Sequence, residues 1–217
     1  MHQTILNLNA IKNEIKANNS LNENIQVIAV SKNFTIDHIK PLLDFGHIHF
    51  GENRVQESLE KWPDIKAKNK NLRLHFIGKL QTNKVKFILP LFDYIHSLDN
   101  LRLAEKINEQ QNKVNFKPKI FIQVNIGEEQ QKSGVLIKDL ENFIRDCKIN
   151  FDLKIIGLMC LPPNNSFPEK YFKEVQRLNK QFNFENLSMG MSSDYLNAIK
   201  HGSNFVRIGS KIFGSRN

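Results

Sequence analysis

Short apolar runs alternate with longer amphipathic segments along the whole chain. The runs are rich in Val, Ile, Leu and Phe and are flanked by polar residues. Short runs of this kind predict strands that are buried on both faces, as in a parallel sheet. The longer segments repeat apolar residues at helical spacing, so they predict helices with one buried face. The chain is therefore expected to repeat a strand–helix unit.

The pattern predicts eight such units. The expected strands are residues 25–32, 47–50, 72–77, 94–97, 120–126, 153–160, 187–191 and 205–208. The expected helices include residues 35–43, 55–62, 80–89, 136–147, 169–182 and 194–201, one that starts at Asn100, and an extra one at the N-terminus over residues 2–18. Eight alternating units favour an α/β fold with a closed (β/α)8 TIM barrel over an open doubly wound sheet. One domain over residues 1–217 is expected.

Composition narrows the function classes. The 217 residues carry a net charge of +9, but the lysines are scattered among Asn, Gln and Glu rather than gathered with aromatic residues. This distribution argues against a nucleic-acid-binding surface. The two cysteines, Cys147 and Cys160, lack metal-ligand spacing, so no metal site is expected. Neither a signal peptide nor a membrane-spanning run is evident, which predicts a cytoplasmic protein.

Lys32 stands at the end of the first predicted strand. Alternation along the strand places it on the same side as Ile28 and Val30, so its stem starts from apolar surroundings. Burial lowers the pKa of an amine and makes a lysine nucleophilic toward an aldehyde. The alternative is that Lys32 simply extends from the strand end into water.

Small polar residues follow the last two predicted strands. Ser192, Ser193 and Asp194 come after the seventh, and Gly209 and Ser210 after the eighth. Barrels often bind phosphate with these two loops, where backbone N–H groups, hydroxyls and a glycine can surround an anion. Each residue alone is also explained as an ordinary helix cap or turn, but their joint occurrence favours a phosphate site.

Arg207 lies on the face of the eighth predicted strand opposite to Val206 and Ile208. A guanidinium inside a barrel mouth needs a hydrogen-bond acceptor. Two kinds of acceptor are open: a carboxylate such as Glu52 or Asp99, or a ring nitrogen of a bound cofactor. An aldehyde-reactive lysine, a phosphate site and this arginine together are typical of a pyridoxal-phosphate site.

Several motifs carry a specific resemblance. They are Ala-Val-Ser-Lys at 29–32, Phe-Gly-Glu-Asn-Arg-Val-Gln-Glu at 50–57, His-Phe-Ile-Gly-Lys-Leu-Gln-Thr-Asn-Lys at 75–84, Gln-Val-Asn at 123–125, Lys-Ser-Gly at 132–134, Gly-Leu-Met at 157–159, Ser-Met-Gly-Met-Ser at 188–192 and Val-Arg-Ile-Gly-Ser-Lys-Ile-Phe-Gly at 206–214. In this order the chain resembles the pyridoxal phosphate homeostasis protein family, whose members are similar to the alanine racemase N-terminal barrel.

The resemblance implies a cofactor site for pyridoxal 5′-phosphate (PLP). It implies that Lys32 forms a Schiff base with the cofactor and that Arg207 faces the pyridine nitrogen. The remaining implied cofactor-binding residues are Asn53 near the ring, Met191, and the phosphate-site residues Ser192, Gly209 and Ser210. Ser193 stands where an acidic residue is often found in the family. No metal ligand and no catalytic residue is implied.

Two functions compete at this point. The first is a non-catalytic PLP-binding protein of intracellular PLP homeostasis. For it the sequence leaves two alternatives open: transient transfer of the cofactor to PLP-dependent apoenzymes, or buffering of the free aldehyde alone. The second is an amino-acid racemase or decarboxylase. Racemases of this type take a second base from an added β domain, which is not expected in a chain that stops at Asn217, so the first reading and a monomer are favoured. Lys84 and Lys132 are candidate amines for accepting the cofactor from Lys32.

Overall fold

Eight parallel strands close into a barrel in the computed structural model, with strand order β1-β2-β3-β4-β5-β6-β7-β8, and β8 pairs with β1. The structure describes residues 1–18, 24–163 and 167–214. The strands are β1 Gln26–Val30, β2 His49–Glu52, β3 Arg73–Phe76, β4 Tyr94–Leu98, β5 Lys119–Val124, β6 Lys154–Cys160, β7 Asn186–Ser188 and β8 Phe205–Ile208. The predicted barrel is confirmed.

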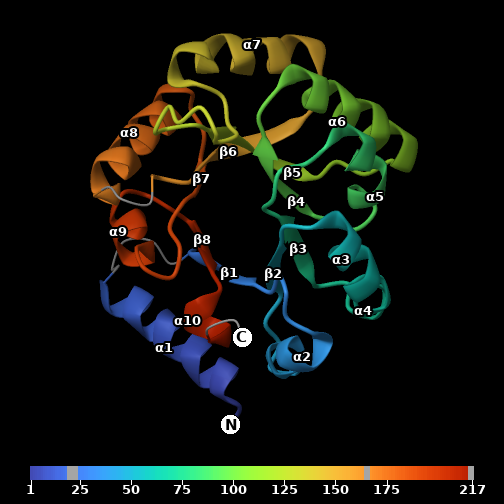
Figure 1. Ribbon diagram of the computed structural model, residues 1–217, viewed down its shortest axis with the longest axis vertical. Helices are drawn as coiled ribbons and strands as arrows, with labels where there is room; N and C mark the ends of the chain where they lie inside the picture. The colour runs from blue at the N-terminus through green and yellow to red at the C-terminus, as the bar shows by residue number, and fades with distance from the viewer. Residues whose placement is uncertain (19–23, 164–166, 215–217) are drawn as a thin grey trace.

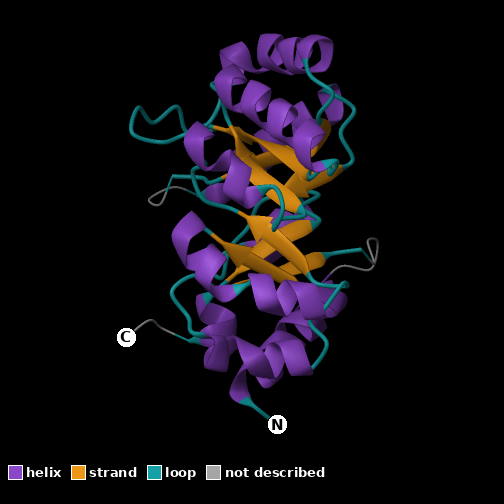
Figure 2. Cartoon of the chain, turned by 90° about the vertical axis from the view of Figure 1, so that its right-hand side faces the viewer, coloured by secondary structure: helices purple, strands orange, loops and turns teal. Residues whose placement is uncertain are grey.

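Helices surround this sheet on its outer side (Figures 1 and 2). They are α1 Gln3–Asn18, α2 Ile36–Asp44, α3 Val55–Lys61, α4 Pro63–Lys68, α5 Val85–Ile88, α6 Leu101–Val114, α7 Leu140–Asn150, α8 Pro168–Gln181, α9 Tyr195–Lys200 and α10 Ser210–Phe213, with short 3₁₀ turns η1 Thr82–Lys84 and η2 Ile137–Asp139. The predicted N-terminal helix α1 packs beside α10. In the described part of the chain, no helix is long and apolar enough to cross a membrane.

The barrel wall separates two sets of side chains, as strand alternation requires. Val27 and Ala29 of β1 belong to the large core between strands and helices. Ile28 belongs instead to a small cluster inside the barrel. The other members of that inner cluster are Tyr94, Phe121, Met159 and Phe205. Polar side chains, among them His75, His96 and Arg207, also lie buried within the sheet.

The predicted element boundaries were wrong at several places next to the mouth of the barrel at the carboxyl ends of the strands; β2 ends at Glu52 rather than Phe50, and β5 ends at Val124 rather than Ile126. β1 ends at Val30, so Lys32 lies in the turn that follows the strand. The predicted helix over 80–89 is reduced to η1 and α5, because Gln81 has extended backbone angles and Pro90 follows closely. β7 ends at Ser188 because Gly190, at φ +92°, turns the chain toward α9.

Candidate functional site

A cavity of about 880 Å³ opens at the carboxyl ends of the strands. This is the end of a parallel barrel where ligands bind. All seven predicted cofactor-site residues line the cavity; they are Lys32, Asn53, Met191, Ser192, Arg207, Gly209 and Ser210. The loops after β1, β2, β7 and β8 therefore bring together side chains that lie up to 178 positions apart in the sequence (210 minus 32).

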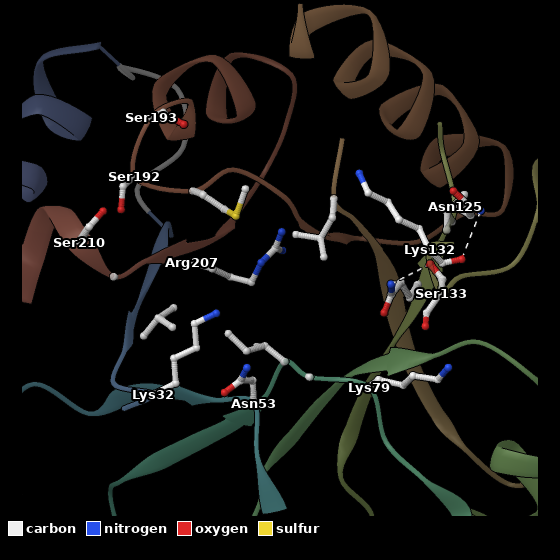
Figure 3. A pocket seen from close by; sticks show the side chains of 18 of the residues that line it. Lys32, Asn53, Lys79, Asn125, Lys132, Ser133, Ser192, Ser193, Arg207 and Ser210 are labelled. Atoms are coloured by element: carbon white, nitrogen blue, oxygen red, sulfur yellow. Dashed lines mark hydrogen bonds between the residues drawn. The ribbon is translucent and has the colours of Figure 1, made fainter. Parts of the chain in front are cut away.

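The turn that carries Lys32 is held by hydrogen bonds from both sides. Ser31 N–H donates to the Gly51 carbonyl at 3.0 Å, and Ser31 Oγ donates to Glu52 Oε1 at 2.8 Å. Asn33, at φ +65°, donates its N–H to Glu57 Oε1 at 2.6 Å. Lys32 is partly buried, and its side chain points from this turn toward the middle of the cavity (Figure 3). The prediction that the side chains of Lys32 and Val30 lie on the same side of the chain is confirmed, since both residues line the cavity.

A buried ion pair lies beneath the Lys32 turn. Glu52 is fully buried, and its Oε1 accepts from Lys61 Nζ and from Trp62 Nε1, each at 3.0 Å. Lys61 Nζ also donates to the Ser31 carbonyl at 3.0 Å. Burial raises the pKa of the Glu52 carboxyl, and the Lys61 charge opposes that rise. The pair thus fixes the backbone of Ser31 from below, next to the residue whose side chain faces the cavity.

Arg207 occupies the floor of the cavity and is only 4% exposed. Its Nη1 donates to Ser188 Oγ at 2.6 Å, and its Nη2 donates to the Cys160 carbonyl at 2.8 Å. Of the two acceptors considered from the sequence, the carboxylate is not the one used: Glu52 is bonded to Lys61, and Asp99 accepts from Asn100. Burial lowers the pKa of the guanidinium. The cavity floor therefore carries a positive charge whose protein partners are neutral oxygens.

Hydroxyl groups from two loops lie together at one side of the cavity. Ser192 and Ser210 come from the loops after β7 and β8 and lie close to each other in Figure 3. Lys211 N–H donates to Ser192 Oγ at 3.4 Å, which ties the two loops together. The helix cap after β7 is Asp194, whose Oδ1 accepts from Met191 N–H at 2.6 Å, so Ser192 is not needed as the cap. This side of the cavity is built for a small anion.

Gly209 is the residue that keeps this side open. A Cβ built there would have Val30 Cβ as its nearest heavy atom, at 3.5 Å, so the fold itself would accept a side chain. Since the fold does not require glycine at this position, the main effect of an added methyl group would be to reduce the space for a ligand in the cavity.

The other side of the cavity carries amide groups and two lysines that the sequence did not single out as cofactor-binding. Asn125 Nδ2 donates to the Glu129 carbonyl at 2.9 Å, and Gln123 Nε2 donates to the Ser133 carbonyl at 2.9 Å. The available signal was the alternation of Gln123 and Asn125 with apolar residues at the end of β5 and just after it. Lys79 and Lys132 line the cavity, whereas Lys84 does not. Lys84 lies over the Phe87 ring, so its predicted place in the site was wrong.

Asn53 provides a test of what the cavity can accept. Its side-chain Oδ1 is buried and has no hydrogen-bond partner among the described residues. A buried acceptor without a donor is costly, so this atom is suited to a ligand that supplies an O–H or N–H group. The hydroxyl on the ring of PLP is such a group, and the donor set of Arg207 and the serines suits its ring nitrogen and phosphate. The residues present therefore fit this cofactor.

Comparison with known proteins agrees with this chemistry. Residues 6–217 match the family of the alanine racemase N-terminal domain. The pyridoxal phosphate homeostasis protein of Haemophilus influenzae is 34% identical over 225 residues, which cover 97% of this chain and 95% of that protein. The chain belongs to the pyridoxal phosphate homeostasis protein family. Another member of the family, from Aquifex aeolicus, is 37% identical over 200 residues, which cover 88% of this chain and 87% of that protein.

A solved structure of the same fold extends the comparison. PipY of Synechococcus elongatus, determined with PLP bound, has a TM-score of 0.85 and 31% sequence identity, and the match covers 98% of this chain and 100% of PipY. PipY without PLP gives a TM-score of 0.86. The homeostasis-protein fold of this chain is therefore equally close to the two states of PipY.

Proposed function

We propose that this protein binds PLP in the cavity at the carboxyl end of the barrel and serves PLP homeostasis rather than catalysis. The observation that carries the proposal is one cavity that combines Lys32, Arg207, the paired hydroxyls and the unpartnered Asn53 oxygen. PLP supplies an aldehyde that joins an amine reversibly with release of water. A protein that holds this aldehyde limits its reaction with other amines.

Each residue has a separate task in the proposed site. Lys32 provides the amine for covalent attachment, because its side chain points into the cavity from a fixed turn. Arg207 binds the ring nitrogen through a guanidinium N–H, which keeps that nitrogen unprotonated. Ser192, Gly209 and Ser210 bind the phosphate, with Met191 beside them. Asn53 accepts a hydrogen bond from the ring hydroxyl.

Two observations favour a protein that binds PLP without catalysis over an amino-acid racemase: the residues that line the cavity and the names of the relatives. Racemisation requires a second base on the face of the ring opposite to the lysine. A tyrosine could serve as this second base, but none of the three tyrosines lines the cavity. Tyr94 lies inside the barrel, and the Tyr195 hydroxyl donates to Glu14. Tyr171 is the third. The relatives that match nearly end to end carry the name of homeostasis proteins. We further propose a cytoplasmic monomer that passes PLP to apoenzymes.

Borohydride fixation tests the proposal directly. The protein is loaded with PLP and reduced, and the modified residue is located by peptide mass spectrometry. We expect the cofactor on Lys32, no fixation in Lys32→Ala, and unchanged fixation in the control Lys79→Ala, which removes another lysine of the same cavity. Fixation on a different lysine with Lys32 unmodified refutes the assignment. Formation of D-alanine from L-alanine by the loaded protein refutes the non-catalytic role.

A further inference from the structure

A row of hydrogen-bonded side chains crosses the inside of the barrel beneath the cavity. His49 Nδ1 lies 2.9 Å from His75 Nε2, and His75 Nδ1 lies 3.0 Å from His96 Nε2. His96 Nδ1 lies 2.8 Å from Ser188 Oγ, which accepts from Arg207 Nη1 at 2.6 Å. The row follows the neighbouring strands β2, β3 and β4 and then crosses to β7 and β8. It ends at the arginine on the cavity floor.

Packing fixes the planes of the histidine rings. His75 is fully buried and stacks on Tyr94, with ring centroids 4.2 Å apart and planes 14° apart. His96 is fully buried and stacks on Phe121 at 4.5 Å and 25°. The rings are joined in series, and the described part of the chain contains no group of three His, Cys, Asp or Glu arranged to hold a metal ion. The row is therefore a chain of hydrogen bonds.

Arg207 sets the direction of these bonds, because a guanidinium can only donate. Ser188 Oγ accepts from it, so the Ser188 proton is available to a second partner. Among the described residues, His96 Nδ1 is the other atom bonded to this hydroxyl. A neutral His96 that accepts at Nδ1 must carry its proton on Nε2.

A neutral histidine that accepts at one ring nitrogen donates from the other, and this rule fixes the remaining hydrogen bonds of the row. His96 donates from Nε2 to His75 Nδ1, and His75 then donates from Nε2 to His49 Nδ1. His49, which is only partly buried, keeps an Nε2–H for water at the end of the row away from the cavity. Every lone pair in the row thus faces toward Arg207, and every proton faces away from it.

We infer that Ser188, His96, His75 and His49 are positioning residues that orient the charged Arg207 toward the cavity through a one-way row of neutral hydrogen bonds. This inference rests on the proposed function, in which Arg207 binds the ring nitrogen of PLP. A carboxylate partner would neutralise the guanidinium and compete with the ligand for its N–H groups. The oriented imidazole dipoles stabilise the charge and leave it available to the ligand.

The surrounding charges favour neutral rings. Burial lowers the pKa of both His75 and His96 well below the usual value for histidine, and the Arg207 charge lowers that of His96 further. Burial lowers the pKa of His49 to about 4, and the nearby charges of Arg73 and Lys119 lower it while Asp93 raises it. The row therefore stays uncharged near neutral pH, as its one-way hydrogen bonding requires.

Nitrogen-15 spectra of the imidazole rings test the direction of the row without any ligand. We expect the Nε2–H tautomer at His49, His75 and His96 in the wild-type protein, and a mixture of tautomers at these rings in Arg207→Met. An Nδ1–H tautomer at any of the three wild-type rings overturns the inference. So does a row that keeps the single Nε2–H form in Arg207→Met, because the arginine would then not set its direction.

Binding of two ligands tests the effect on Arg207. The ligands are PLP and its analogue with carbon in place of the ring nitrogen. His96→Phe keeps a ring on Phe121, and it should weaken PLP binding about tenfold, as expected for impairing a hydrogen bond to a charged group. The analogue should be affected less than about twofold, since it lacks the acceptor for Arg207. The control His47→Gln removes a buried histidine outside the row and should leave both affinities unchanged.

The outcomes separate the two proposals. Equal weakening of PLP and the analogue by His96→Phe shows a general structural effect and overturns the positioning role. Failure of the wild-type protein to bind PLP overturns the proposed function, while the tautomer spectra still decide the direction of the row.

Discussion

Acidification should unfold this protein unusually early, because four histidines are buried in the neutral form. Burial lowers the pKa of His47 to about 3 and that of His49 to about 4, and it lowers the pKa values of His75 and His96 well below 6.5. The unfolded chain binds these protons near pH 6.5, whereas the folded chain does not. Stability is therefore complete above pH 6.5 and is lost as the pH falls toward the folded-state values.

The magnitude follows from the width of this pH range. Each histidine that stays neutral in the folded protein lowers the free energy of unfolding by about 1.4 kcal/mol for every pH unit below 6.5. One such histidine therefore lowers it by about 2 kcal/mol between pH 6.5 and about pH 5. His47 and His49 together remove about 4 kcal/mol, and the lowered pKa values of His75 and His96 add losses of the same sign. The loss from His47 and His49 alone is a large part of the whole stability of an ordinary domain, which is about 5–15 kcal/mol. Partly buried His201 adds a smaller loss of the same sign, because burial also lowers its pKa.

Urea unfolding at a series of pH values measures the effect. The free energy of unfolding should fall near pH 5.5 with a slope of about 2.5 kcal/mol per pH unit from His47 and His49, which take up almost two protons on unfolding, and more steeply with the contributions of His75 and His96. His47→Gln should reduce this slope by about 1.2 kcal/mol per pH unit. His38→Gln, which removes an exposed histidine, should leave the slope as it is in the parent protein. A loss of less than about 1 kcal/mol between pH 7.5 and pH 5.5 would refute the reasoning.

Four further substitutions test the site. Arg207→Ala should weaken PLP retention about 10- to 100-fold with the far-ultraviolet circular dichroism unchanged, since it removes a charged hydrogen-bond donor; equal affinity in equilibrium dialysis counts against the ring-nitrogen role. Gly78→Ala should lower the thermal midpoint and PLP affinity together, because the new Cβ would lie 2.2 Å from the Asn53 carbonyl oxygen, and a normal midpoint contradicts this. Lys132→Ala should slow PLP transfer to an apoenzyme while Lys84→Ala leaves the rate unchanged, because Lys132 alone of the two lines the cavity. If both variants transfer PLP at the wild-type rate, Lys132 does not accept the cofactor from Lys32.

The barrel and the positions of its key residues could be predicted from sequence because both depend on local pattern. Alternation within one strand places Ile28 inside the barrel and Val27 outside it, and it places Arg207 opposite to Val206. The joint position of serines after the last two strands also follows from barrel topology. These inferences need no knowledge of which distant side chains meet.

The partners of buried polar groups could not be predicted in the same way. The sequence offered a carboxylate or a cofactor ring nitrogen as acceptors for Arg207, but its acceptors within the protein are a hydroxyl and a backbone carbonyl that come from β7 and β6. Each histidine of the row looked isolated in the sequence, because its partner lies 21 or more positions away. Lys84 was placed in the site by its distance from a strand end, but a short helical turn directs it away.

The hydrogen bonds beneath the Lys32 turn have a consequence for the speed of ligand uptake. Glu52 and Lys61 hold Ser31 by hydrogen bonds within the protein, so the turn that carries Lys32 does not have to become ordered when PLP enters. Binding to such a preformed receptor proceeds without a slow conformational step, and the observed rate should rise in proportion to the ligand concentration. The protein would then follow a sudden rise in the free aldehyde as fast as collision and amine chemistry allow.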